Sequence, residues 1–165
     1  MILAVDVDYR IDNAIVAGVT FSGWSDEAPD RVIHSKITNV RSYQSGQFYR
    51  REMPCILKLL NDYDLTPDII VIDGYVVLGQ ELKPGLGMRL YETLDKKIPI
   101  IGVAKTAFKD SKSESEVFRG ESKKPLYVTA VGIGDQIAKN YISSMHGKHR
   151  MPTLLKLVDR ECRKG

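Results

Sequence analysis

The stretch PDIIVIDG, residues 67–74, decides how this chain folds. Residues 69–72 form a continuous apolar run, which is typical of a strand buried on both faces of a sheet. Asp73 follows where the run ends, and Gly74 allows the chain to turn sharply. This pattern predicts a carboxylate at the solvent-facing rim of a rigid sheet, although an ordinary Asp-Gly turn is the alternative interpretation.

A second carboxylate lies inside an apolar run near the N-terminus. The run is ILAVDVDY, residues 2–9, and Asp6 occupies its middle. Burial of an isolated carboxylate is costly unless the group is paired or bound to a metal ion. Asp6 is therefore a candidate site residue together with Asp73.

Length and composition indicate one globular domain. The chain has 165 residues, 43% of them hydrophobic, so we expect residues 1–165 to form a single domain with a substantial core. The net charge of +3 is too small to indicate nucleic-acid binding by itself. Basic clusters at residues 50–51, 123–124 and 148–150 could line a phosphate path or belong to a mixed solvated surface.

The cysteine content and the hydropathy pattern favour a soluble cytoplasmic protein. Cys55 and Cys162 have neither the spacing of a zinc site nor the density of a secreted disulfide scaffold, so we expect both to be reduced. No run reaches about 18 apolar residues, and the sequence begins with a strand pattern rather than a charged leader. We therefore expect no contact with a membrane.

The order of elements predicts an α/β fold with one mixed sheet. Three consecutive strands with short turns form an antiparallel meander at the N-terminal end. Pro54 is expected to begin a helix, because proline fits its first position, and Glu52 would then lie just outside that helix. A buried strand over residues 98–103 is expected to pair in parallel with residues 69–72 through a helical crossover. The other expected elements are strands over residues 2–8, 14–24, 30–40 and 126–130, and helices after Pro84, over 135–144 and from Pro152.

Four acidic residues occupy unusual positions in this arrangement. Asp6 and Asp73 come from strands, Glu52 from a helix entrance, and Asp159 from near the core-facing side of the last helix. Distant segments could thus converge on one hard cation, although four unrelated surface acids are the alternative. Ligands that are all oxygen favour Mg²⁺ or Mn²⁺ over zinc, and such sites commonly act on phosphodiesters.

The chain resembles the endonuclease V family, a group of repair nucleases with a ribonuclease H-like fold. Five short motifs occur in the family's order and at compatible spacing, which indicates homology along nearly the whole chain. The matching residues are Asp6 in VDVDY; Tyr43, Gly46, Arg51, Glu52 and Pro54; Asp73 and Gly74; Gly102, Val103, Ala104 and Lys105; and Arg150, Pro152 and Asp159.

The resemblance implies a magnesium-dependent endonuclease that recognises a deaminated purine, chiefly inosine, in DNA or RNA. Such an enzyme hydrolyses a phosphodiester on the 3′ side of that base and leaves 3′-hydroxyl and 5′-phosphate ends. We expect a monomer of single-domain ribonuclease H-like fold, in which helices flank the mixed sheet.

The resemblance also assigns roles to individual residues. Asp6 and Asp73 would be the principal metal ligands, with Glu52 and Asp159 completing the site, and Lys105 would stabilise charge on the scissile phosphate. Manganese is the expected substitute for magnesium. Tyr43 would be a wedge that fills the gap left by an extruded base. The predicted substrate contacts are Tyr43, Gly46, Gly74, Gly79 and Arg150.

The loop after Asp73 departs from the family pattern. Val76 stands where the family has a glycine that lets the backbone approach the base, and Gly79 replaces a histidine. Ser42 and Ser45 replace prolines that flank the wedge tyrosine. These departures leave three hypotheses: an inosine-directed nuclease, a divergent nuclease of the same fold with another substrate preference, and a catalytically weak nucleic-acid-binding protein. Retention of the acids argues against the third, because carboxylates that hold no metal repel one another.

Overall fold

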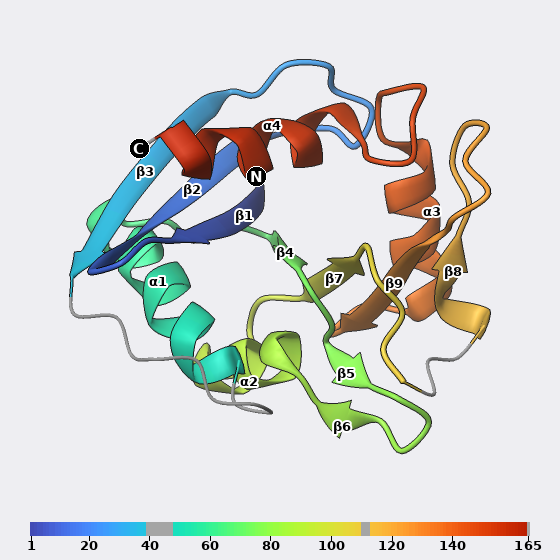
Figure 1. Cartoon of the computed structure of the whole chain (residues 1–165), viewed down its shortest axis with the longest axis horizontal. Helices are drawn as coiled ribbons and strands as arrows, with labels where there is room; N and C mark the ends of the chain where they lie inside the picture. Colours follow the sequence, from blue (N-terminus) through green and yellow to red (C-terminus); the bar gives the residue numbers. More distant parts are fainter. Residues whose placement is uncertain (39–47, 110–112, 165) are drawn as a thin grey trace.

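A seven-stranded mixed sheet runs through the computed structural model, which describes residues 1–38, 48–109 and 113–164 (Figure 1). The strand order is β3-β2-β1-β4-β7-β9-β8. The strands are β1 (Ile2–Tyr9), β2 (Asn13–Phe21), β3 (Arg31–Thr38), β4 (Ile69–Asp73), β7 (Ile100–Ala104), β8 (Glu116–Val117) and β9 (Leu126–Val131). A separate two-stranded hairpin joins β5 (Val77–Leu78) to β6 (Lys83–Pro84).

The sheet has the mixed character that the sequence predicts. Strands β1, β2 and β3 form the antiparallel meander. The run at residues 69–72 pairs in parallel with β1 on one side and with β7 on the other, and Ile70, Val71 and Ile72 are buried. The predicted parallel pairing of β4 with β7 is therefore confirmed.

Two layers of helices cover the sheet, one on each face (Figure 1). Helices α1 (Phe48–Asp62) and α2 (Leu86–Thr93) bury Ile56, Leu59 and Leu90 in one core. Helices α3 (Asp135–Ser144) and α4 (Thr153–Lys164) bury Ile142 and Leu154 in the other. Successive side chains of a strand point to opposite faces, so β1 contributes to both cores, with Leu3 on the α1 side and Ala4 on the α4 side.

The expected start of the first helix is wrong. Helix α1 begins at Phe48, so Pro54 lies inside it and Glu52 is a helical residue rather than a residue before the helix. Proline in a helix interior removes a hydrogen bond and costs about 3 kcal/mol. Burial of the apolar face that contains Cys55, Ile56 and Leu59 offsets this cost, because each fully buried large side chain contributes about 1.5–3 kcal/mol.

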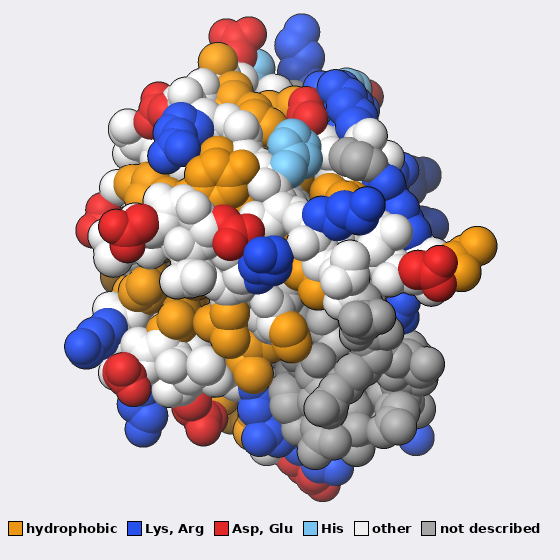
Figure 2. Space-filling model, turned by 90° about the vertical axis from the view of Figure 1, so that its left-hand side faces the viewer, with side chains coloured by type: hydrophobic (Ala, Val, Ile, Leu, Met, Phe, Trp, Pro, Cys, Tyr) orange, Lys and Arg blue, Asp and Glu red, His pale blue; other side chains and the backbone are white. Residues whose placement is uncertain are grey.

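The cysteines and the surface charges agree with what the composition indicates. Both cysteines are free and buried. Figure 2 shows basic and acidic side chains interspersed with apolar ones on the face that it displays, in keeping with the small net charge. Among the described helices, none is both long enough and apolar enough to cross a bilayer.

Candidate active site

Asp6 and Asp73 lie level with each other on neighbouring strands. The parallel register of β1 and β4 pairs Ala4 with Val71, and each aspartate is two residues further along its strand. Side chains two residues apart share a face, so both carboxylates point to the same side as Ala4 and Val71, which is the α4 side. Asp73 ends β4 and is exposed at the rim, as its sequence position predicts.

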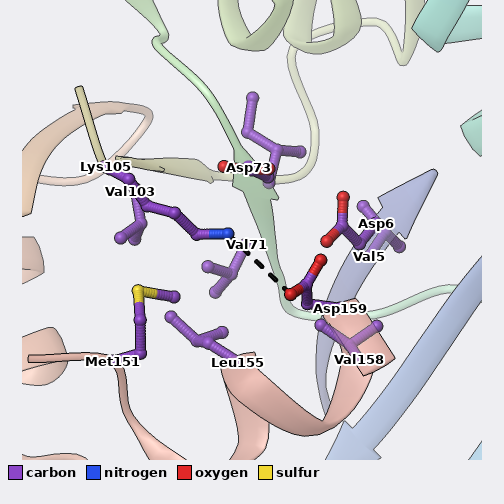
Figure 3. Close-up of a pocket in the computed structure, with 11 residues that line it drawn as sticks. Val5, Asp6, Val71, Asp73, Val103, Lys105, Met151, Leu155, Val158 and Asp159 are labelled. Carbon is purple, nitrogen blue, oxygen red and sulfur yellow. Dashed lines mark ion pairs between the residues drawn. The ribbon is translucent and has the colours of Figure 1, made fainter. Parts of the chain in front are cut away.

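Asp159 brings a third carboxylate from helix α4. It lies over the strand ends and faces Asp6 (Figure 3). A hydrogen bond joins the carboxyl groups of Asp159 and Asp6. The apolar floor beneath them is formed by Val5, Val71, Val103, Met151, Leu155 and Val158.

Glu52 approaches the same two strands from the opposite layer. It is only 8% exposed and lines a small gap together with Asp6, Asp73 and Leu86. Its position inside helix α1 fixes its direction, because the helix packs on the sheet through neighbouring apolar residues. Asp6 and Asp73 therefore lie between Glu52 on one side and Asp159 on the other.

Burial, together with neighbouring negative charge, raises the pKa of three of the four carboxyl groups. Burial, followed by the charge of Asp73, raises the pKa of Asp6 to about 7. Burial and then the charge of Asp6 raise the pKa of Glu52 to about 8. The pKa of Asp73 is also raised, mainly because surrounding protein atoms desolvate its carboxyl group despite the exposure of the residue, and Lys105 opposes this shift. A cation among these groups would favour their ionised forms.

Asp159 behaves differently because basic side chains surround it. Burial alone would raise its pKa, but hydrogen bonds from Arg163 and Asp6 and the charge of Lys105 lower it overall. Arg163 Nη2 lies 2.6 Å from Asp159 Oδ2, and Lys105 Nζ lies 4.0 Å from the same oxygen. Asp159 thus supplies a carboxylate that is already ionised at the edge of the cluster.

Lys105 follows strand β7 directly and points its ammonium group toward the acids (Figure 3). Its backbone is held by Arg150, whose Nη2 donates a hydrogen bond to the Lys105 carbonyl oxygen and whose Nε donates one to Pro125 O at 3.1 Å. Arg150, predicted as a substrate contact, is therefore half-buried and occupied with backbone carbonyls. This arrangement fixes the point from which the Lys105 side chain extends.

Arg119 anchors the segment that carries Arg150. The side chain of Arg119 is 5% exposed, and its two terminal nitrogens donate hydrogen bonds to four carbonyl oxygens. The acceptors are Met145 at 2.6 Å, His149 at 2.7 Å, Gly147 at 3.2 Å and Arg150 at 3.2 Å. Sequence reasoning missed this residue, because a lone arginine in a polar stretch carries no signal of burial.

The remaining predicted residues fall into two groups. Tyr43 and Gly46 lie outside the described residues. Gly74 adopts a φ of 140°, a conformation that side chains other than glycine rarely take, and it forms the turn at the rim. Gly79 has a φ of 68° and lies in the following loop against Phe108.

The donor set suits a hard divalent cation. Four carboxylates converge from β1, α1, β4 and α4, and carboxylate oxygens are the ligands that magnesium and manganese prefer. Cys162, also missed from the sequence, is close as well, since ligand atoms of Asp6, Asp159 and Cys162 all lie within 4.8 Å of one another. Its spacing of three residues from Asp159 on α4 is the signal that would have located it. Burial raises the pKa of the Cys162 thiol to about 12, which leaves the oxygens as the ligands near neutral pH.

Comparisons with known proteins show which family the chain matches. The family model for endonuclease V matches residues 1–144. The structure is similar to that of human endonuclease V, with a TM-score of 0.78, 19% identity, and coverage of 99% of this chain and 82% of that one. No curated protein sequence gives a significant match.

Two further structures have the same similarity in fold. Endonuclease V from Ciona intestinalis, in complex with a 24-residue DNA that contains an inosine followed by a ribo-adenosine, matches with a TM-score of 0.80 and 19% identity over 99% of this chain and 84% of that one. Endonuclease V from Streptomyces avermitilis matches with a TM-score of 0.76 and 25% identity over 99% and 79%. Asp159 lies beyond the residues that the family model matches, and the structure places it beside Asp6.

Proposed function

Because this chain belongs to the endonuclease V family and is therefore an endonuclease, we propose that it hydrolyses a phosphodiester on the 3′ side of inosine in a metal-dependent reaction. The observation that carries this proposal is the meeting of Asp6, Asp73 and Asp159 beside Lys105 at one end of the sheet. The inosine-containing DNA bound by the Ciona intestinalis protein supports the choice of base.

The acids and Lys105 would have different roles. The acids would bind the metal ion, and Lys105 would contact the substrate's phosphate. Asp6 and Asp73 would hold the ion, and Glu52 and Asp159 would complete its surroundings directly or through water. Bound there, magnesium or manganese would supply Lewis-acid stabilisation of the phosphate and a water of lowered pKa. Lys105 would donate hydrogen bonds to a phosphate oxygen and stabilise the negative charge that develops on it. The expected products carry a 3′-hydroxyl and a 5′-phosphate.

A divergent nuclease with another preference is the second candidate. The observation that favours it is Val76, which is completely buried in the loop after Asp73 where the family places a glycine. A side chain at this position alters the shape of the loop wall without changing the acids. The choice of base could therefore differ from that of the family even though the metal-binding acids are retained.

One assay distinguishes the candidates. The protein is incubated with magnesium and matched DNA and RNA strands, each with and without a single inosine, alongside an Asp73→Ala variant. Cleavage next to inosine that Asp73→Ala abolishes supports the proposal. Cleavage that depends on Asp73 but ignores inosine selects the second candidate, and tight binding without cleavage selects a nucleic-acid-binding protein with little catalytic activity.

A further inference from the structure

The C-terminal turn of helix α4 is held by polar contacts rather than by apolar packing. The buried side chains of α4 are Leu154, Leu155, Val158 and Cys162, and the residues that follow Cys162 are exposed. The last four carbonyl groups of a helix have no partner within it, and such an end frays unless other groups donate to them. Contacts from outside the helix must therefore hold this end of α4.

Two basic side chains from the sheet supply these contacts. Arg10 lies in the turn between β1 and β2, and its Nη2 donates hydrogen bonds to Arg163 O at 3.0 Å and to Cys162 O at 3.4 Å. His34 lies on β3, and its Nε2 donates to Glu161 O at 3.2 Å. Three of the last four carbonyl oxygens of α4 thus accept hydrogen bonds from basic groups, which are also favoured at the negative end of the helix dipole.

Both basic residues are fixed on the strands that carry the site. Arg10 Nε donates a hydrogen bond to Asp8 Oδ2 at 3.2 Å. In the sheet register, His34 pairs with Ala17 and Ala17 pairs with Asp6, so His34 is level with Asp6 two strands away. Helix α4 packs across β1, β2 and β3, and its C-terminal end lies beside β3 (Figure 1). Arg10 and His34 therefore join the end of the helix to the part of the sheet that holds Asp6.

The turn that they hold is close to the acids. Cys162, whose carbonyl oxygen Arg10 contacts, has its Sγ within 4.8 Å of carboxylate oxygens of both Asp6 and Asp159. Each helical residue adds about 1.5 Å, so Asp159 is only about 6 Å along the axis from Arg163. Unwinding of the last turn would thus shift the carboxylate of Asp159 relative to Asp6.

We infer that Arg10 and His34 are positioning residues, which hold Asp159 beside Asp6 through the backbone of the last turn of α4. Neither residue lines the pocket that Asp6 and Asp159 share, so both act on the site from a distance. The contacts run through carbonyl oxygens and do not depend on the side chain of Arg163. This inference rests on the proposed function, because it requires Asp159 to contribute to the binding of the ion.

Calorimetric titration of magnesium into the full chain is the first test. Arg10→Ala should weaken magnesium binding by about tenfold, because loss of a group that orients a metal ligand commonly costs about 10–100-fold in affinity, and His34→Ala should weaken it by a smaller factor. Arg10→Lys, which keeps a donor, should restore part of the affinity. Ile11→Ala, fully exposed in the same turn, and Lys36→Ala, exposed on β3, are the matched controls. Unchanged affinity in both Arg10→Ala and His34→Ala would overturn the inference.

A double variant separates positioning from a general loss of stability. In an Asp159→Ala background, Arg10→Ala should not weaken further the magnesium binding that Asp6 and Asp73 retain, because the carboxylate that Arg10 positions is absent. Chemical denaturation in EDTA verifies that each variant is folded under the conditions of the titration. A further tenfold loss of affinity in the Asp159→Ala background would contradict the inference.

Hydrogen exchange gives a readout that needs neither metal nor cleavage. In EDTA, the backbone amides of residues 160–164 should exchange faster in Arg10→Ala than in Ile11→Ala or the unmodified protein, whereas those of α1 should not change. Equal exchange at residues 160–164 in the three proteins would contradict the inference. Cleavage that ignores inosine in the unmodified protein would instead contradict the proposed function, and the absence of magnesium binding by that protein would contradict both.

Discussion

Lys105 Nζ lies 4.0 Å from Asp159 Oδ2, although the two residues come from the end of strand β7 and the face of helix α4. The pair places one cation at the edge of a group of four carboxylates. A phosphate oxygen that approached between them would meet a positive group on one side and the cluster of carboxyl groups on the other. This relation between Lys105 and Asp159 is the arrangement on which the proposed chemistry depends.

Removal of the Lys105 ammonium group is expected to slow the chemical step. Lys105→Ala should lower kcat by about 100-fold or more, because a donor aimed at developing charge is lost, while KM changes little. Single-turnover cleavage of an inosine-containing strand measures the effect. Lys109→Ala, which alters an exposed lysine four residues further on, should retain the rate of the unmodified protein. Equal losses in the two variants would show that general positive charge, rather than this position, matters.

Arg150 is expected to act on the reaction through the position of Lys105. Arg150→Ala removes the hydrogen bonds to the carbonyl oxygens of Lys105 and Pro125 and should lower kcat by about tenfold, with metal affinity unchanged. Arg150→Lys should restore part of the rate. Arg160→Ala, at an exposed position of α4, is the control. If Arg150→Ala raised KM and left kcat intact, the role of Arg150 would be a direct contact with the substrate rather than the positioning of Lys105.

Without metal, the acids should make stability depend on pH. The folded-state pKa of Glu52, about 8, lies above the ordinary value of 4.5, so the folded chain binds more protons than the unfolded chain between these values. The free energy of unfolding in EDTA should therefore decrease as pH rises from about 5 to 8. Asp6, with a pKa of about 7, acts in the same direction.

Glu52→Gln tests this dependence. The variant should lose part of the pH dependence and be more stable than the unmodified protein at pH 8 in EDTA by about 2 kcal/mol, given 1.36 kcal/mol per pKa unit and incomplete burial of the charge. Chemical denaturation at several pH values provides the measurement. Added magnesium should cancel the advantage. A stability that rises with pH in EDTA would contradict the assignment of raised pKa values to this cluster.

Arg163 is expected to compete with a bound metal ion for Asp159. Its guanidinium lies 2.6 Å from Asp159 Oδ2 and is largely exposed, so its removal should cost little stability. Arg163→Ala should strengthen magnesium binding about threefold, because one carboxylate oxygen loses a competing cation. Calorimetric titration of magnesium measures this change, and Lys164→Ala, which alters the next residue and its pair with Glu161, is the control. Weaker binding in Arg163→Ala would show that Arg163 orients Asp159 for the ion.

Strand ends were the most predictable part of the site. The apolar run at residues 69–72 fixes a buried strand, and the aspartate after it must emerge at the rim, so the place of Asp73 follows from local pattern alone. The position of Asp6 beside Asp73 depends on the parallel pairing of β1 with β4, a contact between distant segments that the sequence pattern did not predict.

Features that depend on contacts between distant segments could not be predicted. Pro54 indicated a helix start, but packing of α1 on the sheet extends the helix to Phe48. The sequence around Arg119 is typical of an exposed surface. In the structure, the loop before α4 provides four carbonyl oxygens that accept hydrogen bonds from its side chain. A cavity beside Tyr75 arises only when α3 is docked on β9. Tertiary packing, rather than sequence pattern, decides each of these.

Asp6 and Asp73 are expected to share a divalent ion, and the proposed chemistry depends on that ion. The most direct test soaks crystals of the protein in Mn²⁺ and calculates an anomalous difference map, with Asp73→Asn crystals as the control. If the two residues share an ion, a peak is expected about 2.0–2.2 Å from carboxylate oxygens of both, and the Asp73→Asn crystals should lack it. A map with no peak between these two carboxylates, or with manganese bound only at exposed acids elsewhere, would contradict it.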